Sequence, residues 1–160
     1  MRKAYFHIGF SKTGSSSLQG YLSFNPVHET RKTHEKLMYC SFEKGGKIIY
    51  GEDLLKSAIS TPLKYSSSFS GIAEQLENSK TKLELDKIFE QGVTPIFSQE
   101  DWGRTAEHFK HSDFFGQLEL DVYVIVYVRP QVDWFNSAWW QWFAWNGDFV
   151  TPKDVIDAWG

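Results

Sequence analysis

A lysine lies inside a glycine- and serine-rich stretch near the start of the chain. The stretch FHIGFSKTGSSSLQ begins at Phe6 and places Lys12 between Gly9 and Gly14. Glycines permit tight or left-handed turns, lysine supplies a mobile positive charge, and serine hydroxyls donate hydrogen bonds. These residue types in this order predict a binding site for an anion such as phosphate. A Walker A loop has its lysine directly after the second glycine, so this spacing disfavours an ATPase.

A second candidate anion contact follows a strongly apolar segment. After the run DVYVIVYV comes RPQVDWFNS, with Arg129 just beyond the run and Ser137 eight residues further on. A guanidinium can donate two parallel hydrogen bonds to a phosphate, and a serine hydroxyl can donate another. A plain glycine–serine turn would explain the first motif on its own. The second motif favours the anion site over that alternative.

Strands and helices alternate around the two motifs. Short β-prone runs predict the strands, and apolar residues at helical spacing predict the helices. We expect strands at residues 4–8, 37–42, 93–98 and 121–128, and helices at 15–24, 28–36, 52–59, 72–91, 131–146 and from 151 onward. This alternation indicates one α/β domain over residues 1–160 with a mainly parallel sheet. Ligands of such sheets bind at the carboxyl ends of strands, where both motifs lie.

Several local patterns add detail to this fold. The run DVYVIVYV is nearly continuous in β-branched and aromatic residues, which predicts a strand buried on both faces of the sheet. The serine cluster of TPLKYSSSFSG predicts an exposed loop. Pro95 lies in the strand expected at 93–98, and proline is uncommon in central strands. We expect His7 to pack inside the first strand and Cys40 to be a small buried side chain.

Both motifs resemble signatures of the sulfotransferases that use 3′-phosphoadenosine 5′-phosphosulfate (PAPS). FHIGFSKTGSSSLQ is similar to the phosphosulfate loop of that family, in which a lysine precedes a small residue, a glycine and two or three hydroxyl residues. YVRPQVDWFNS is similar to the second signature, an arginine and a serine that hold the 3′-phosphate. The resemblance is confined to these two motifs, in the expected order. It implies a P-loop NTPase-like three-layer fold.

The resemblance also implies a role for each residue of the two motifs. Lys12 would reach the bridging oxygen between phosphate and sulfate and relieve charge on the departing phosphate, which makes it a catalytic candidate. The 5′-phosphate would be held by Thr13, Gly14, Ser15, Ser16 and Ser17. Arg129 and Ser137 would hold the 3′-phosphate. The cofactor would be PAPS, leaving as adenosine 3′,5′-bisphosphate, with no metal ion.

The acceptor side rests on a single carboxylate. Sulfuryl transfer to a hydroxyl or an amine needs a general base. Glu100 lies in SQEDW, just after the strand expected at 93–98, so we expect it at the same sheet edge as the two motifs. It would be the base or an acceptor contact, and the alternative is a carboxylate that caps a helix. The acceptor would be a carbohydrate or another alcohol or amine.

Aromatic residues crowd the helix expected at 131–146. Aromatics form 17% of the chain, with seven tryptophans, and DWFNSAWWQWFAWNGDF places them on every face of a helix. A core-facing stripe would consist of Phe135, Trp139, Trp142 and Phe143. The residues left on other faces are Trp134, Trp140 and Trp145. Three alternatives could bury these side chains. They are a C-terminal part that the family generally has and this chain lacks, a second copy in a homodimer, or a bound acceptor sugar.

Composition excludes several other classes of protein. Hydrophobic residues at 41% and charged residues at 23% are typical of a soluble globular domain. A net charge of −3 gives no support for a nucleic-acid partner, and a single cysteine rules out an intrachain disulfide. The sequence contains neither a recognisable signal peptide nor an apolar run of about 18 residues, so we expect a cytoplasmic protein without a membrane partner.

Two other functions compete with sulfuryl transfer. The first is a truncated or non-catalytic relative that binds adenosine 3′,5′-bisphosphate, or a partner chain, without turnover. The second is a nucleotide kinase, which the position of Lys12 disfavours.

Overall fold

The computed structural model describes residues 2–9, 13–74, 78–140, 151 and 153 of the chain. Its centre is a six-stranded sheet in the order β2-β3-β5-β1-β6, with β4 paired to β3 outside that order. The strands are β1 (Arg2–Gly9), β2 (Val27–Glu29), β3 (Lys36–Phe42), β4 (Ile48–Tyr50), β5 (Thr94–Gln99) and β6 (Leu120–Tyr127). The β3–β5, β5–β1 and β1–β6 pairs are parallel, whereas β2 and β4 pair antiparallel with β3. The prediction of an α/β fold with a mainly parallel sheet is confirmed.

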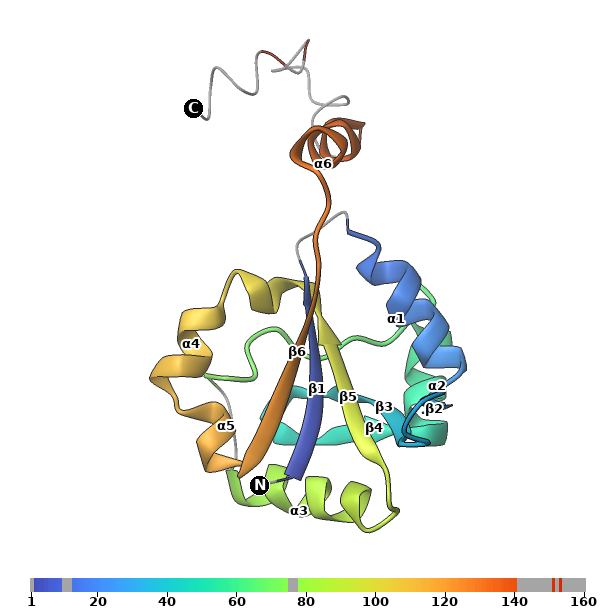
Figure 1. The fold of residues 1–160 in the computed structure, drawn as a ribbon, viewed down its shortest axis with the longest axis vertical. Coiled ribbons are helices and arrows are strands. Elements are labelled where there is room, and N and C mark those ends of the chain that lie inside the picture. Colours follow the sequence, from blue (N-terminus) through green and yellow to red (C-terminus); the bar gives the residue numbers. More distant parts are fainter. Residues whose placement is uncertain (1, 10–12, 75–77, 141–150, 152, 154–160) are drawn as a thin grey trace.

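Helices cover both faces of the sheet. They are α1 (Ser15–Phe24), α2 (Gly51–Ser60), α3 (Asn78–Phe89), α4 (Ala106–His111), α5 (Phe114–Gln117) and α6 (Gln131–Ala138), with 3₁₀ turns η1 (Lys44–Gly46) and η2 (Glu100–Gly103). In Figure 1, α1 and α2 lie on one side of the sheet, and α4 and α5 lie on the other. Helix α3 lies across the end at which β1 begins, and α6 stands beyond the end of β6.

Two separate cores hold these layers together. The smaller core joins Leu22 of α1 and Leu54 of α2 to Tyr39 and Ile96 of the sheet. The larger core lies on the opposite face and contains side chains from α3, α4 and α5. Aromatic rings dominate it, and Phe97 stacks on Phe42 with ring centroids 4.1 Å apart. Much of the unusual aromatic content of the chain is therefore core packing.

The strand β6 is an edge strand, which corrects one prediction. Its extent agrees with the run DVYVIVYV, and it pairs with β1 along its whole length. However, β1 is its only partner among the described strands, and both of its faces are largely open to solvent. Tyr123 is 48% exposed and Val124 is 53% exposed, although they point to opposite faces. The apolar pattern identified the strand correctly, but it does not occupy the interior of the sheet.

The prediction of a helix at residues 28–36 is wrong. Residues 27–29 form β2, and the chain turns back directly into β3. The turn is closed by a hydrogen bond from the Thr30 amide to the Glu35 carbonyl at 2.9 Å, with His34 in the left-handed region at φ 54°. Pairing with a strongly apolar strand outweighed the weak helical preference of this polar segment.

One further prediction needs a smaller correction. The helix expected at 72–91 is shorter in the structure, because α3 spans only Asn78–Phe89. The strand expected at 93–98 is confirmed as β5, which lies between β3 and β1 although it contains Pro95. Of the helix expected at 131–146, the structure describes α6 and two further residues, and the helix expected from 151 lies almost wholly outside the described residues.

The serine-rich loop is buried in part rather than exposed. Ser66 and Ser68 are 4% and 1% exposed. The Ser66 amide donates to Ser23 Oγ at 3.0 Å, and the Phe42 amide donates to Ser68 Oγ at 3.2 Å. Tyr39 Oη also donates to the Ser66 carbonyl at 2.7 Å. The hydroxyls therefore satisfy backbone groups and allow the loop to cross the sheet edge without leaving buried polar atoms unpaired.

The other predicted elements agree with the structure, which also contains β4, α4 and α5 at positions for which no element was predicted. Strand β1, helix α1, strand β3 and helix α2 lie within a residue or two of the predicted bounds. Cys40 is buried, and burial raises the pKa of its thiol well above its usual range, which agrees with a structural side chain. Within the described residues, no helix combines the length and apolarity needed to cross a bilayer.

Candidate functional site

The two predicted motifs and Glu100 all follow strands that end at the same edge of the sheet. In the parallel register, Gly9 of β1 is aligned with Tyr127 of β6, and Ile8 is aligned with Gln99 of β5. The glycine-rich loop, the segment that leads to Arg129, and Glu100 therefore all leave the sheet at the same edge. This is the carboxyl edge, where ligands of open α/β sheets bind.

The loop after β1 ends in a sharp turn at the start of α1. Gly14 is the N-cap of α1 and has φ 90°, a left-handed conformation that glycine adopts without strain. At Gly9 the restriction is one of space, because an added Cβ would lie 2.9 Å from Ser15 Oγ and that side chain would have to move. The turn directs the free amide groups of the first helical turn toward the loop, where the helix dipole also favours an anion.

The predicted loop residues are not equivalent in the structure. Ser15 is 2% exposed and faces inward, with its Oγ 3.5 Å from Thr13 Oγ1. Ser16 and Ser17 are exposed, and Ser16 Oγ lies 3.4 Å from the Tyr65 hydroxyl. Lys12 lies outside the described residues. The described part of the loop thus offers one buried and two accessible serine hydroxyls around a helix N-terminus.

The second motif brings its two predicted residues together. Arg129 follows β6, and Ser137 lies in α6, whose N-cap is Pro130. Arg129 Nη1 donates to Ser137 Oγ at 3.2 Å, across the eight-residue spacing noted in the sequence. Both side chains are on the accessible side of this segment, and α6 stands beyond the carboxyl end of the sheet (Figure 1).

Glu100 lies in the first turn of η2, directly after β5. Its neighbour Gln99 caps this turn by accepting a hydrogen bond from the Asp101 amide at 3.3 Å. Trp102 anchors the turn to the core, because its side chain is 1% exposed and its Nε1 donates to the Ser70 carbonyl at 3.2 Å. Glu100 is thereby fixed at the sheet edge, in a position that fits either a helix-terminal carboxylate or an acceptor contact.

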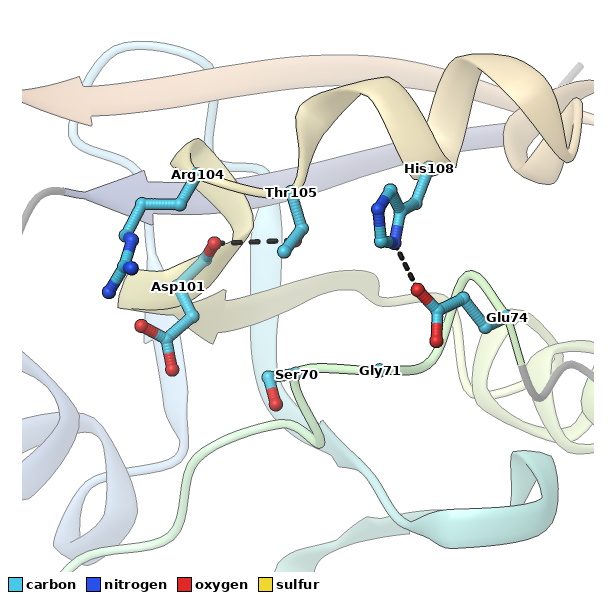
Figure 2. Close-up of a pocket in the computed structure, with 7 residues that line it drawn as sticks. All are labelled: Ser70, Gly71, Glu74, Asp101, Arg104, Thr105 and His108. Carbon is cyan, nitrogen blue, oxygen red and sulfur yellow. Dashed lines mark hydrogen bonds and ion pairs between the residues drawn. The ribbon is translucent and has the colours of Figure 1, made fainter.

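A hollow of about 430 Å³ opens beside η2 and α4 (Figure 2). It is lined by Ser70, Gly71, Glu74, Asp101, Arg104, Thr105 and His108. On one side of the hollow His108 forms an ion pair with Glu74, and on the other side the Arg104 side chain extends away from this pair (Figure 2). Six of the seven lining residues carry polar side chains, and sequence reasoning missed the hollow because these residues come from two loops and a short helix.

A buried polar cluster lies directly beneath the glycine-rich loop, and sequence reasoning missed most of it. His7 is 1% exposed, as predicted, and its Nδ1 lies 2.8 Å from Ser98 Oγ. Gln19 of α1 donates to the same Ser98 oxygen at 3.1 Å. The position of Gln19, one helical turn after Ser15, was a usable signal, because residues four apart share a helix face. Burial lowers the pKa of His7, so its imidazole is held in the neutral form.

The aromatic helix is only partly described. Trp139 is 7% exposed, in agreement with the predicted core-facing stripe, and Phe135 is half-buried. Trp140 is 61% exposed, as expected for a residue outside the stripe. Trp134, also expected outside the stripe, is half-buried, whereas Trp142, Phe143 and Trp145 lie outside the described residues.

Comparison with known proteins assigns no relative. No protein-family model, curated protein sequence or solved structure matches this chain. Within the described residues, no group of three or more His, Cys, Asp or Glu side chains is arranged to hold a metal ion.

Proposed function

We propose that this protein binds PAPS and transfers its sulfuryl group to a hydroxyl or amine acceptor. The nucleotide would lie along the carboxyl edge of the sheet, between the loop after β1 and the segment after β6. The adjacent parallel pairing of β1 and β6 supports this placement, because it sets the two predicted anion contacts side by side. A P-loop NTPase-like identity of the fold is part of the same proposal.

The observation that carries the proposal is the contact between Arg129 and Ser137. The resemblance assigned both residues to one phosphate, and their side chains lie within hydrogen-bonding distance at 3.2 Å. A guanidinium and a hydroxyl that already adjoin can donate to the same anion with little reorganisation. A nucleotide with a single 5′-polyphosphate would leave this contact without a ligand group, whereas PAPS carries a separate 3′-phosphate.

Different residues would act on the leaving phosphate and on the acceptor. Sulfuryl transfer forms a bond from the acceptor oxygen or nitrogen to sulfur and breaks the bond from sulfur to the bridging oxygen. Lys12 and the amide groups at the start of α1 would stabilise the negative charge that develops on the departing phosphate. Glu100 would take the acceptor proton, and the polar hollow next to η2 has room for a hydrophilic acceptor.

Ligand-dependent thermal stabilisation tests the proposal directly. Adenosine 3′,5′-bisphosphate at about one hundred times its dissociation constant should stabilise the protein by roughly 2.7 kcal/mol. ATP with Mg²⁺ at the same concentration should stabilise it much less. Stronger stabilisation by ATP would reject the sulfotransferase proposal in favour of a nucleotide kinase.

A turnover assay separates the enzyme from a non-catalytic relative. The protein is incubated with PAPS labelled with ³⁵S and a mixed panel of carbohydrate, alcohol and amine acceptors, and labelled product is separated from PAPS. Transfer to any acceptor supports the enzyme. Tight binding of the bisphosphate without transfer to any member of the panel would favour the binding protein.

A further inference from the structure

The hollow beside η2 and α4 is held in shape by contacts between its walls (Figure 2). Trp102 Nε1 donates to the Ser70 carbonyl at 3.2 Å, which fixes the loop on one wall to η2 on the other. An ion pair between His108 and Glu74 joins the same loop to α4. The volume of about 430 Å³ is typical of sites for small molecules, and a space that is already formed needs little reorganisation to take a ligand.

Two charged side chains of this hollow have no partner among the described residues. They are Asp101 and Arg104, which lie on the side away from the ion pair of His108 with Glu74 (Figure 2). Their backbone is fixed, because the Arg104 amide donates to the Asp101 carbonyl at 2.9 Å and Thr105 Oγ1 donates to the same carbonyl at 3.3 Å. The carboxylate and the guanidinium form no ion pair with each other, so both are available to a ligand.

Opposite charges that do not neutralise each other restrict the ligands that fit. A ligand with only a negative charge would be attracted by Arg104 and repelled by Asp101, and a ligand with only a positive charge would meet the reverse. A neutral sugar would gain from hydrogen bonds alone. A small molecule with both an ammonium group and a carboxylate can satisfy the two side chains at once, the ammonium group at Asp101 and the carboxylate at the guanidinium fork.

We propose that the hollow binds the acceptor and that this acceptor is a small zwitterion with a hydroxyl group, such as a hydroxylated amino acid. The inference rests on the proposed sulfuryl transfer and narrows its acceptor class. Asp101 holds the ammonium group, Arg104 holds the carboxylate, and the hydroxyl is the group that is sulfated.

The position of Asp101 supports this assignment. Asp101 directly follows Glu100, the proposed base, in the first turn of η2. A ligand held by Asp101 is therefore close to the sheet edge at which Glu100 lies. An ammonium group has no lone pair, so it cannot attack the sulfur atom while it is paired with Asp101. The hydroxyl oxygen forms the bond to sulfur, the bond from sulfur to the bridging oxygen breaks, and Glu100 takes the hydroxyl proton.

L-Homoserine is a suitable probe because each of its charged groups can be removed separately. 3-Aminopropan-1-ol lacks the carboxylate, 4-hydroxybutanoate lacks the amine, and glucose is a neutral polyol. Binding is measured with and without adenosine 3′,5′-bisphosphate, from the NMR signal of the Trp102 indole N–H, which donates to the Ser70 carbonyl of one wall. Homoserine should bind at least about tenfold more tightly than each of the other three compounds, the effect of losing one charged hydrogen bond.

Two substitutions assign the charged groups of the ligand to the two side chains. Asp101→Asn should weaken homoserine binding about tenfold and should not weaken the binding of 4-hydroxybutanoate, which has no amine. Arg104→Gln should weaken homoserine binding by a similar factor and should not weaken the binding of 3-aminopropan-1-ol, which has no carboxylate. Glu107→Gln and Lys110→Gln are the matched controls, at exposed positions of α4 outside the lining of the hollow, and should leave all of these affinities unchanged.

Transfer of label from ³⁵S-labelled PAPS decides whether the hollow serves the acceptor. Labelling of homoserine that falls in both variants supports the inference. Homoserine binding no tighter than that of glucose or of a singly charged analogue would overturn it, as would labelling of other acceptors but not of homoserine, or labelling that neither variant reduces. In these cases the proposed function stands as long as adenosine 3′,5′-bisphosphate binds.

The opposite result separates the two proposals. If homoserine binds with the expected pattern but adenosine 3′,5′-bisphosphate does not bind, sulfuryl transfer is wrong, and the hollow is a zwitterion site without an acceptor role. Asp101 is half-buried and Arg104 is exposed, so we expect both variants to fold. Should one of them fail to fold, the four compounds measured on the wild-type protein still decide the ligand class.

Discussion

The two halves of the proposed nucleotide site are built in opposite ways. The loop after β1 rests on a strand between two partners, above a buried network of His7, Ser98 and Gln19. The segment after β6 continues an edge strand, and there Arg129 Nη1 donates to Ser137 Oγ at 3.2 Å on the accessible surface. One half is fixed by the core, and the other is fixed locally.

Because of this difference, substitutions in the two halves should affect folding stability and ligand binding differently. Residues beneath the first half contribute to folding and to the site at once, so a substitution there changes both. Residues of the second half lie outside the two cores, so a substitution there should change binding with little effect on the free energy of unfolding. Paired substitutions in the two halves can test this separation.

The largest expected effect is on stability and contrasts an interior strand with the edge strand. Phe97 of β5 is fully buried and stacks on Phe42, so Phe97→Ala should lower the free energy of unfolding by about 3–5 kcal/mol. Val124 of β6 is 53% exposed, so Val124→Ala should cost less than about 1 kcal/mol. Urea denaturation of both variants measures the contrast.

A large cost for Val124→Ala would contradict the description of β6 as an open edge. It would mean that another chain or another part of this protein covers the strand in solution. Sedimentation of the wild-type protein at micromolar concentration would then distinguish a homodimer from a monomer.

The sequence predicted the first half of the site more completely than the second. The strand, loop and helix from β1 to α1 follow from local rules, because a β-prone run, two glycines and a helical pattern occur consecutively. The contact of Arg129 with Ser137 also follows from local spacing along one segment. The position of β6 at the edge does not, because an apolar pattern reports the preference of a strand and not the number of its neighbours.

The remaining parts of the site depend on contacts between distant segments. Ser98 and His7 meet because β5 and β1 are adjacent, although 91 positions separate them in the chain. The serine-rich loop is buried because Ser23 and Phe42 supply hydrogen-bond partners for its polar groups. Neither pairing leaves a periodic signal in the sequence. Composition alone therefore predicted a solvated loop.

The next largest effect concerns turnover in the first half. Lys12→Ala should lower kcat for sulfuryl transfer by about 10²–10³-fold, because the contact strengthens as the phosphate leaves. The dissociation constant of adenosine 3′,5′-bisphosphate should change by a smaller factor. Lys110→Ala, at an exposed position of α4, removes the same charge and should leave both quantities unchanged. Equal losses in turnover and binding would contradict the catalytic role.

Arg129→Ala should act on binding alone. Loss of a charged hydrogen bond to the 3′-phosphate should weaken binding of adenosine 3′,5′-bisphosphate by about 1.5–3 kcal/mol. The free energy of unfolding should stay within about 0.5 kcal/mol of the wild-type value, since Arg129 is exposed. Isothermal titration calorimetry and urea denaturation measure the two effects. Arg31→Ala, at an exposed position of the turn between β2 and β3, is the matched control, and an equal loss of affinity there would mean that the Arg129→Ala effect reflects net charge alone.

The smallest expected effect concerns an ion pair that links the interior to the edge strand. Lys3 Nζ donates to Glu35 Oε2 at 2.9 Å and also lies 4.8 Å from the centre of the Tyr123 ring of β6. Thr94 of β5 donates to the other oxygen of Glu35 at 2.8 Å. The hydrogen bond from Lys3, aided by Thr94, holds the pKa of Glu35 below its usual range against the opposing effect of burial.

A lowered carboxyl pKa has a defined consequence for acid stability. The contribution of Glu35 is present above the unfolded-state pKa of about 4.3 and is lost as the pH falls through the lower folded-state pKa. Solvent screens this partly exposed pair, so Glu35→Gln should cost only about 0.2–1 kcal/mol at pH 7. The difference from wild type in urea denaturation should shrink below about pH 4.3, while Glu90→Gln, at an exposed position after α3, should show no such difference at either pH. If the Glu35→Gln difference persisted at acidic pH, its origin would be packing rather than charge.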